Sequence, residues 1–209
     1  MTTTMCEPTV FVVDDDVSVL RSIARLLRLN DLATKTYDCP WTFLREIDAA
    51  SSGCLLLDLS LRDVSGLEVQ DQLVAARCSL PVVFLTAYGT VQSSVRAMKA
   101  GAFDFIEKPF ENAVLLGAVH RALERDRAAR ASRSSNALIS GRLALLTPRE
   151  AQVLRHVIAG MLNKQIAARL GTAEKTVKVH RARVMQKMSV RSVAELTRAA
   201  LVAGLQPER

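Results

Sequence analysis

The sequence lacks the cysteine patterns that build disulfide frameworks or zinc sites. Its four cysteines lie in the first half of the chain at irregular spacings, at positions Cys6, Cys39, Cys54 and Cys78. None belongs to a Cys-x-x-Cys pair, and no set of histidines lies nearby, so the usual ligand spacing of a zinc site is absent. Cys54 lies in an apolar run, and we expect it to be a small core residue. A reducing, cytoplasmic compartment fits this use of cysteine best.

Segments that export a protein or anchor it in a membrane are also missing. The N-terminus reads MTTTMCEPTVFVV, without a basic stretch ahead of a long apolar one, so we expect no signal peptide. No apolar run approaches the roughly 20 residues that span a bilayer. We therefore expect a soluble, cytoplasmic protein with no membrane partner.

Charge is distributed unevenly along the chain. Residues 1–120 carry 10 Lys/Arg and 15 Asp/Glu, a net charge of −5, whereas residues 121–209 carry 18 and 6, a net charge of +12. The modest total of +7 therefore hides two halves of opposite sign. A basic half of this size favours an anionic partner, usually nucleic acid, although a merely solvated basic surface has the same composition.

The first half alternates short apolar runs with helical patterns. Residues 9–13, 33–37, 54–57, 82–86 and 103–106 are rich in β-branched, leucine or aromatic residues and are predicted strands. Helical spacing of apolar residues follows each of them, first at Val19, Ile23, Leu26 and Leu27, then near 41–50, 67–77 and 91–99, and from about 111. Five strands each followed by a helix predict an α/β, doubly wound, flavodoxin-like domain with a parallel sheet of five strands.

The second half is predicted to be all-α. Thr147, Pro148 and Glu150 form a complete capping-box signature for a first helix that Gly160 ends. Asn163 is expected to cap a short second helix that Gly171 stops, and a third helix is expected over 174–188. Ser192 and Glu195 predict a second capping box for a fourth helix. Two short helices joined by a tight turn that contains glycine are typical of a helix-turn-helix.

Chemical groups gather at the predicted carboxyl ends of the strands, where ligands bind in doubly wound folds. Three aspartates, Asp14 to Asp16, follow the first strand, Asp58 follows the third, Thr86 ends the fourth and Lys108 follows the fifth. Clustered carboxylates repel one another unless a cation neutralises them, and oxygen ligands suit Mg²⁺. Such a set has what phosphoryl transfer needs, with Asp58 as nucleophile, Mg²⁺ and Lys108 neutralising phosphoryl oxygens, and Thr86 donating a hydrogen bond. Each residue alone is also an ordinary strand-end turn residue.

Several segments resemble a known family. VFVVDDD, CLLLDLSLRDVSGLEVQ, VVFLTAYG and AGAFDFIEKPF are similar, in order and spacing, to the receiver domain of two-component response regulators. The segment LTPREAQVLRHVIAGMLNKQIAARLGTAEKTVKVHRARVMQKMSVRS resembles the LuxR-type DNA-binding domain. The combination is similar to the NarL/FixJ family, closest to its FixJ-like branch. Residues 121–142 are charged, poor in large apolar residues and contain Ser-Ser and Ser-Gly. From this change in composition we expect a receiver over 1–124, whose last helix continues to about Arg130, a helical or flexible linker over 125–142 and the helix-turn-helix domain over 143–209.

The resemblance implies roles for individual receiver residues. Asp58 matches the phosphoacceptor, Asp15 a direct Mg²⁺ ligand and Asp14 a ligand acting through water, with the Ser60 carbonyl completing the protein ligands. Thr86 and Lys108 match the switch hydroxyl and the phosphate-binding amine, Phe105 matches the aromatic switch position, and the Lys108–Pro109 peptide matches one that is typically cis.

The chain departs from the family pattern in one loop. The segment after the phosphoacceptor commonly reads Met-Pro-Gly, and here it is Leu61-Arg62-Asp63. Loss of that proline predicts a less rigid loop, and Arg62 is expected to alter what docks there. Ser60 and Tyr88 occupy the variable positions that tune hydrolysis in the family.

The third helix of the second half carries the predicted DNA-binding face. On a helical wheel, one side presents cations, an amide and small apolar groups, a surface that suits a major groove. The resemblance places base contacts at Lys178, Val179 and Ala182. Phosphate contacts are expected from Asn163, Lys164, Lys175, Thr176, His180, Arg183 and Lys187.

Together these features predict a phosphorylation-dependent DNA-binding transcriptional regulator, most commonly an activator in this family. Its expected partners are a sensor histidine kinase, double-stranded DNA, a second copy of the chain on phosphorylation, and RNA polymerase. We expect no enzyme beyond the receiver's own phosphorylation and dephosphorylation. Two alternatives stay open: a regulator that binds DNA independently of phosphate, and a phosphotransferase or phosphatase with a phospho-aspartyl intermediate.

Overall fold

The computed structural model describes residues 7–87, 91–206 and 208. The chain divides into two compact units, residues 1–130 and 131–209. Residues 131–142, which the sequence analysis assigned to a linker, therefore group with the second unit.

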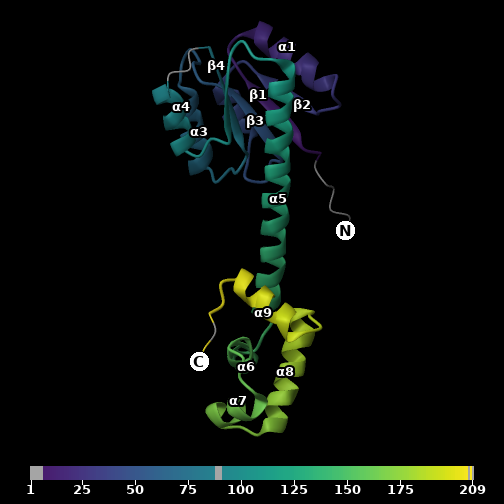
Figure 1. Ribbon diagram of the computed structural model, residues 1–209. Coiled ribbons are helices and arrows are strands. Elements are labelled where there is room, and N and C mark those ends of the chain that lie inside the picture. The colour runs from purple at the N-terminus through teal and green to yellow at the C-terminus, as the bar shows by residue number, and fades with distance from the viewer. Residues whose placement is uncertain (1–6, 88–90, 207, 209) are drawn as a thin grey trace. The chain divides into compact units, whose positions relative to one another are not determined.

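The first unit is built on a parallel sheet of five strands. These are β1 (Thr9–Val13), β2 (Thr34–Tyr37), β3 (Gly53–Asp58), β4 (Val82–Thr86) and β5 (Asp104–Glu107), in the order β2-β1-β3-β4-β5 (Figure 1). The order reverses beside β1, which is the switch point where doubly wound sheets bind ligands. The predicted fold class is confirmed.

Five helices follow the strands, namely α1 (Val17–Arg28), α2 (Pro40–Glu46), α3 (Gly66–Ala75), α4 (Val91–Lys99) and α5 (Asn112–Ala144). One apolar cluster packs α1 and α5 against one face of the sheet, and another packs α2, α3 and α4 against the opposite face. All six residues of β3 are buried because both faces are covered, and Cys54 among them is a core residue as expected.

Helix α5 extends further than the sequence suggested. The Ser-Ser and Ser-Gly dipeptides after Arg130 indicated a break, but the helix continues to Ala144. No proline interrupts this stretch, and its alanine, arginine and leucine residues are good helix formers, so the weak breaking signals of serine and glycine do not end the helix. Its first half is attached to the sheet by the buried Asp126 carboxylate, which accepts hydrogen bonds from the Gly53 backbone N (3.0 Å) and the Arg130 Nε (2.8 Å).

The second unit contains α6 (Pro148–Ile158), α7 (Asn163–Leu170), α8 (Glu174–Met188) and α9 (Val193–Val202). Val153, Leu154, Ile166, Val184 and Leu196 form its centre, and Ile139 and Leu143 from α5 pack on them. The Thr147–Glu150 capping box is confirmed, and Gly171 ends α7 in the left-handed conformation (φ 61°).

Two predicted caps differ in detail. Asn163 is the first residue of α7 rather than its N-cap, and the backbone N of Leu162 is satisfied by the Gln165 side chain (2.8 Å). Ser192 caps α9 as expected, but the Glu195 carboxylate accepts from the backbone N of Arg191 instead of that of Ser192. Within the described residues, no helix is both long and apolar enough to cross a membrane.

Candidate functional site

The ends of four strands bring the predicted chemical groups of the first unit to one edge of the sheet. Asp14 directly follows β1, Asp58 ends β3, Thr86 ends β4 and Lys108 directly follows β5. Neighbouring strands are in parallel register, with Val13 opposite Leu57, Asp58 opposite Leu85 and Thr86 opposite Glu107. The registers therefore place these side chains together although they come from distant parts of the sequence.

Lys108 is the central cation of this edge. Its Nζ donates to Asp14 Oδ2 at 2.6 Å and to Asp58 Oδ1 at 2.6 Å, and both carboxylates are buried. Its backbone N donates to the carbonyl of Thr86 at 2.6 Å. One lysine therefore holds both buried carboxylates and is itself positioned by the end of β4. The Lys108–Pro109 peptide is cis, as the resemblance implied.

Burial and the neighbouring charges shift the pKa values of Asp14 and Lys108 in opposite directions. Burial raises the pKa of the Asp14 carboxyl above its usual range, although the hydrogen bond from Lys108 opposes the shift. For Lys108, burial alone would lower the pKa, but its hydrogen bonds to Asp14 and Asp58 outweigh burial, and the pKa is raised. Lys108 is therefore a full cation at neutral pH.

The loop after β3 supplies the remaining contact of Asp58. Asp58 Oδ2 accepts from the backbone N of Ser60 at 2.7 Å. Gly66, the first residue of α3, lies close to the backbone of Asp58. A Cβ at Gly66 would lie 2.4 Å from the carbonyl oxygen of Asp58. Only glycine fits there, so the Ser-Gly at the start of α3 belongs to the architecture of the site.

The three consecutive aspartates have different environments. Asp14 is buried and bonded to Lys108, whereas Asp15 is partly exposed and bonded to Arg62 Nε at 2.9 Å. Asp16 is the N-cap of α1 and accepts from the backbone N of Ser18 at 2.7 Å. Asp16 therefore stabilises a helix end, and Asp14 and Asp15 remain as the candidates for chemistry.

The two predicted switch residues lie on the β4–β5 side of the site. Thr86 is completely buried, and Phe105 is partly buried and packs against the apolar cluster that contains Phe84 and Ala97. Tyr88, predicted at a position that tunes hydrolysis, lies outside the described residues.

The oxygen donors at this edge have the chemistry that Mg²⁺ prefers. Asp14, Asp15 and Asp58 have carboxylates, and Ser60, predicted to act through its carbonyl, is exposed. Among residues 7–87, 91–206 and 208, no three His, Cys, Asp or Glu side chains converge in metal-ligand geometry. Lys108 pairs with Asp14 and Asp58, and Arg62 pairs with Asp15. The donor set therefore fits the ion by type.

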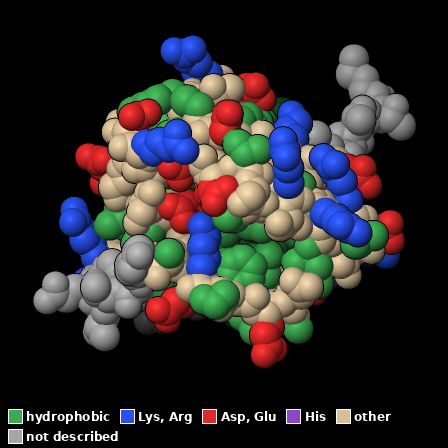
Figure 2. All heavy atoms as spheres, turned by 90° about the horizontal axis from the view of Figure 1, so that it is seen from above, with side chains coloured by type: hydrophobic (Ala, Val, Ile, Leu, Met, Phe, Trp, Pro, Cys, Tyr) green, Lys and Arg blue, Asp and Glu red, His purple; other side chains and the backbone are tan. Residues whose placement is uncertain are grey.

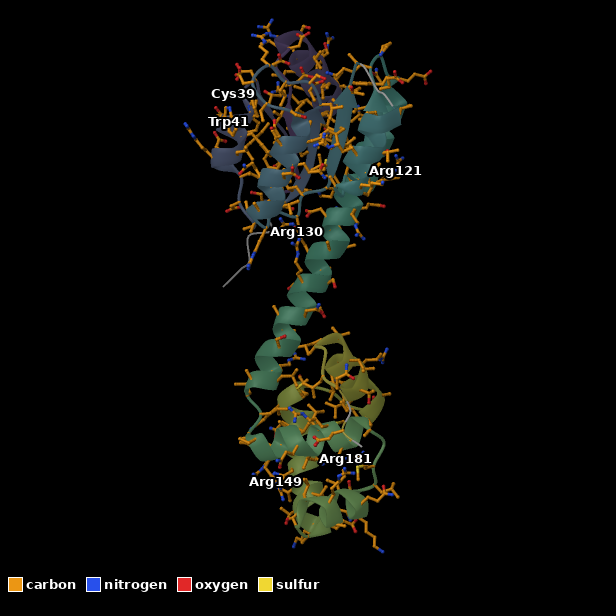
Figure 3. The ribbon with its side chains drawn as sticks, turned by 90° about the vertical axis from the view of Figure 1, so that its left-hand side faces the viewer. Cys39, Trp41, Arg121, Arg130, Arg149 and Arg181 are labelled. Atoms are coloured by element: carbon orange, nitrogen blue, oxygen red, sulfur yellow. The ribbon has the colours of Figure 1, made fainter. Side chains whose placement is uncertain are left out.

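In the second unit, two arginines fix the helix that precedes α8. Arg149 of α6 donates to the carbonyl of Leu170 at the end of α7, and Arg181 of α8 donates to Asn163 Oδ1 at its start, at 3.0 Å (Figure 3). Both ends of α7 are thereby attached to its neighbours. Asn163, predicted to contact phosphate, instead has its side-chain oxygen on Arg181.

Helix α8 buries one face and exposes the other. Val177, Val184 and Met188 are buried in the core. Six of the predicted DNA contacts on this helix have exposed side chains, namely Lys175, Thr176, Lys178, Val179, Ala182 and Arg183. Lys164 on α7 is exposed as well, and His180 is partly buried.

Lys187 differs from the other cations of α8. Its Nζ donates to the buried Glu150 carboxylate at 2.6 Å and to the Leu145 carbonyl at 3.1 Å. This ammonium has a structural partner, so it is less suited to a phosphate contact than the sequence suggested. The pair was not predicted because 37 residues separate its members and no local pattern links them.

The chain matches two family models, the response regulator receiver domain over residues 10–120 and the bacterial regulatory proteins of the luxR family over residues 144–200. It is 42% identical to the transcriptional regulatory protein FixJ of Rhizobium meliloti over 203 residues, which is 97% of this chain and 100% of FixJ. The chain belongs to the NarL/FixJ family of response regulators.

Other similar proteins agree with this assignment. Nodulation protein W of Bradyrhizobium diazoefficiens is 41% identical over 94% of this chain and 86% of its own length. The solved response regulator StyR is 45% identical with a TM-score of 0.85, covering 94% of this chain and 99% of StyR. Full-length FixJ from B. japonicum is 34% identical with a TM-score of 0.59, covering 96% and 98%. This response regulator is thus a transcriptional regulator of a two-component system, with a receiver and a LuxR-type DNA-binding domain.

Proposed function

We propose that Asp58 is the phosphoacceptor of this response regulator and that its modification controls DNA binding through α8. The observation that supports this most directly is the Lys108 ammonium, 2.6 Å from both Asp14 and Asp58 at the carboxyl edge of the sheet. An Asp58 oxygen attacks the phosphorus of a phosphohistidine on the sensor kinase. The P–O bond forms as the P–N bond breaks, and the histidine nitrogen keeps the electron pair and takes up a proton.

Asp14, Asp15, Asp58 and the Ser60 carbonyl are the residues that would hold Mg²⁺. When bound, the ion supplies positive charge that offsets the phosphoryl oxygens. Lys108 adds a fixed positive charge from the protein, and the backbone N of Ser60 orients the second oxygen of Asp58. The receiver in this proposal catalyses only its own phosphorylation and dephosphorylation, and the chain is not a turnover enzyme.

The signal leaves the site through Thr86 and Phe105. Thr86 moves toward the phosphoryl group, Phe105 follows into the space beside β4, and the surface formed by α4 and β5 changes shape. Two receivers then pair, and the paired DNA-binding domains bind a two-fold site. Exposed Val95 and Met98 on α4 are apolar groups that such pairing would cover.

For DNA recognition we propose that Lys178, Val179 and Ala182 face base edges. Lys164, Lys175, Thr176, His180 and Arg183 contact phosphates, and Lys187 primarily stabilises the domain through Glu150. RNA polymerase is the further partner expected of a transcriptional activator.

The test replaces Asp58 and a matched neighbour. Asp58→Asn should abolish incorporation of a phosphoryl group from acetyl phosphate and the dimerisation that follows, measured by intact mass and light scattering. Asp63→Asn removes an exposed carboxylate from the same loop and should change neither quantity. Phosphoryl-dependent dimerisation that persists in Asp58→Asn would refute the switch and leave a regulator that binds DNA independently of phosphate.

A further inference from the structure

Arg62 forms an ion pair with Asp15, a carboxylate that the proposed metal site needs. Its Nε donates to Asp15 Oδ2 at 2.9 Å, and its Nη2 reaches the Asp15 backbone carbonyl at 3.5 Å. The guanidinium therefore contacts this one residue through both its side chain and its main chain.

The loop that carries Arg62 is well fixed despite the missing proline. Leu61 is buried in the core beside α3, and Ser60 and Ser65 form a backbone bridge across the loop. Ser65 and Glu68 form a capping box at the start of α3. These contacts position the Arg62 backbone beside the Asp15 loop.

All three carboxylates of the site have a cationic partner within the protein. Lys108 bonds to Asp14 and Asp58, and Arg62 bonds to Asp15. Lys108 is partly enclosed, with 19% of its side chain exposed, whereas 78% of the Arg62 side chain is exposed. Arg62 is therefore the cation that can leave the site without unpacking the protein.

We propose that Arg62 is an internal competitor of the divalent cation, which must displace it from Asp15, so that Arg62 weakens metal binding by this receiver. This rests on the metal site proposed above. Exposed ion pairs are weak, but the guanidinium charge also repels a divalent ion nearby. Together these effects predict that removing Arg62 tightens metal binding about threefold to tenfold.

The experiment titrates Mn²⁺, a paramagnetic probe for the Mg²⁺ site, into the full-length protein and measures free Mn²⁺ by electron paramagnetic resonance. Arg62→Ala should lower the Kd for Mn²⁺ about threefold to tenfold in low salt, and the difference should shrink in about 1 M salt, where exposed charges are screened. Mg²⁺ should displace Mn²⁺ at correspondingly lower concentration from Arg62→Ala.

Two control variants separate the possible outcomes. Arg28→Ala removes the same charge at the far end of α1, about 16 Å along the helix axis from its start, and should leave the Kd unchanged. Asp15→Asn removes the contested ligand, should weaken binding, and should reduce the effect of a further Arg62→Ala substitution to the part that comes from charge repulsion.

The outcomes distinguish this proposal from the function on which it rests. Equal Kd values for the wild type and Arg62→Ala, with weaker binding in Asp15→Asn, would refute competition by Arg62 and leave the metal site standing. An equal gain in Arg28→Ala would also refute it, because the effect would then be one of net charge. If Asp15→Asn and Asp58→Asn bind Mn²⁺ as tightly as the wild type, the metal assignment itself fails, and the proposal fails with it.

Discussion

Glu150 has two structural roles in the DNA-binding domain. Its carboxylate accepts from the backbone N of Thr147 at 2.9 Å, which completes the capping box of α6, and from Lys187 Nζ at 2.6 Å, which attaches α6 to α8. The hydrogen bond from Lys187, followed by that from Thr147, lowers the pKa of Glu150 from 4.5 to about 2. A single buried side chain thus connects a helix start to the helix that is proposed to read DNA.

This pKa shift predicts acid sensitivity of the second domain. The folded-state pKa lies below the unfolded value, so the contribution of Glu150 is fully present above about pH 4.5 and is lost as the pH falls toward 2. Glu150→Gln should lower the unfolding free energy by about 1–3 kcal/mol at pH 7. It should also flatten the dependence of the unfolding free energy on pH between about pH 5 and about pH 2.5. Urea unfolding followed by helical circular dichroism measures this.

The receiver provides an internal reference for that measurement. Trp41 is the one tryptophan of the sequence and lies in α2, so its fluorescence follows the receiver. Glu174→Gln, an exposed change on α8, is the matched control and should shift the circular dichroism transition by less than about 0.5 kcal/mol. An equally flat pH profile in Glu174→Gln would show that Glu150 is not the responsible group.

At the same scale, the sequence predicted which residues form the site but not how they pair. Asp14, Asp58, Thr86 and Lys108 could be predicted because strand ends of a parallel sheet meet at one edge. The Arg62–Asp15 pair joins residues 47 positions apart, in two loops whose paths depend on packing, so no pattern in the sequence points to it. Acidic and basic side chains lie interspersed on the face shown in Figure 2, so each charged group has several possible partners and the sequence does not say which one it pairs with.

At the scale of elements, the periodicity of apolar residues predicts helices and strands correctly wherever burial determines the structure. The strands at 9–13 and 82–86 have the predicted bounds. Strand β2 differs from its prediction by one residue at its start, and β3 and β5 differ by one residue at each end, where apolar content no longer distinguishes a strand from its loop. Helix α5 continues past its predicted end because helix propensity and tertiary packing outweigh the local serine and glycine signals. The Asn163 cap was wrong for a similar reason, since Arg181 attracts the asparagine side chain.

The end of α5 is part of the DNA-binding domain, which leads to a prediction about fragments. Ile139 and Leu143 pack against its core, and Arg142 Nη1 donates to the Met188 carbonyl at the end of α8 (3.0 Å). A fragment of residues 131–209 should therefore be more stable than one of residues 143–209, by about 1–3 kcal/mol for the lost apolar burial and hydrogen bond. Urea unfolding of both fragments checks this.

A variant of the longer fragment separates the two contributions. Arg142→Ala in residues 131–209 removes the hydrogen bond and keeps the apolar contacts, so its stability should fall between those of the two fragments. Equal stability of all three would place the domain boundary at residue 143, as the sequence analysis assigned it.

At the scale of the whole molecule, the acidic receiver and the basic DNA-binding domain have opposite charges and separate tasks. The receiver half carries −5 and the remainder +12, so the salt dependence of DNA affinity should reflect the second domain almost alone. The exposed cations proposed to contact phosphates are Lys164, Lys175 and Arg183. Three phosphate-neutralising contacts predict a slope of log K against log salt of about −3 for one domain.

This slope distinguishes two ways in which phosphorylation could increase affinity. If phosphorylation pairs two receivers, both DNA-binding domains engage the duplex and the slope should roughly double, to about −5. If it only frees an occluded α8, affinity should rise while the slope stays at about −3. The measurement is fluorescence anisotropy on a duplex selected from random sequence by the phosphorylated protein, over about 50–300 mM salt, with and without acetyl phosphate. A doubled slope without acetyl phosphate would mean that the unmodified chain already binds as a pair, and pairing would then no longer explain the effect of phosphorylation.

Two lysines of α8 should differ in their effect on this slope. Because Lys187 is bonded to Glu150, Lys187→Ala should lower the stability of the domain with little change in slope. Lys175→Ala should instead make the slope shallower by about 1 per domain engaged.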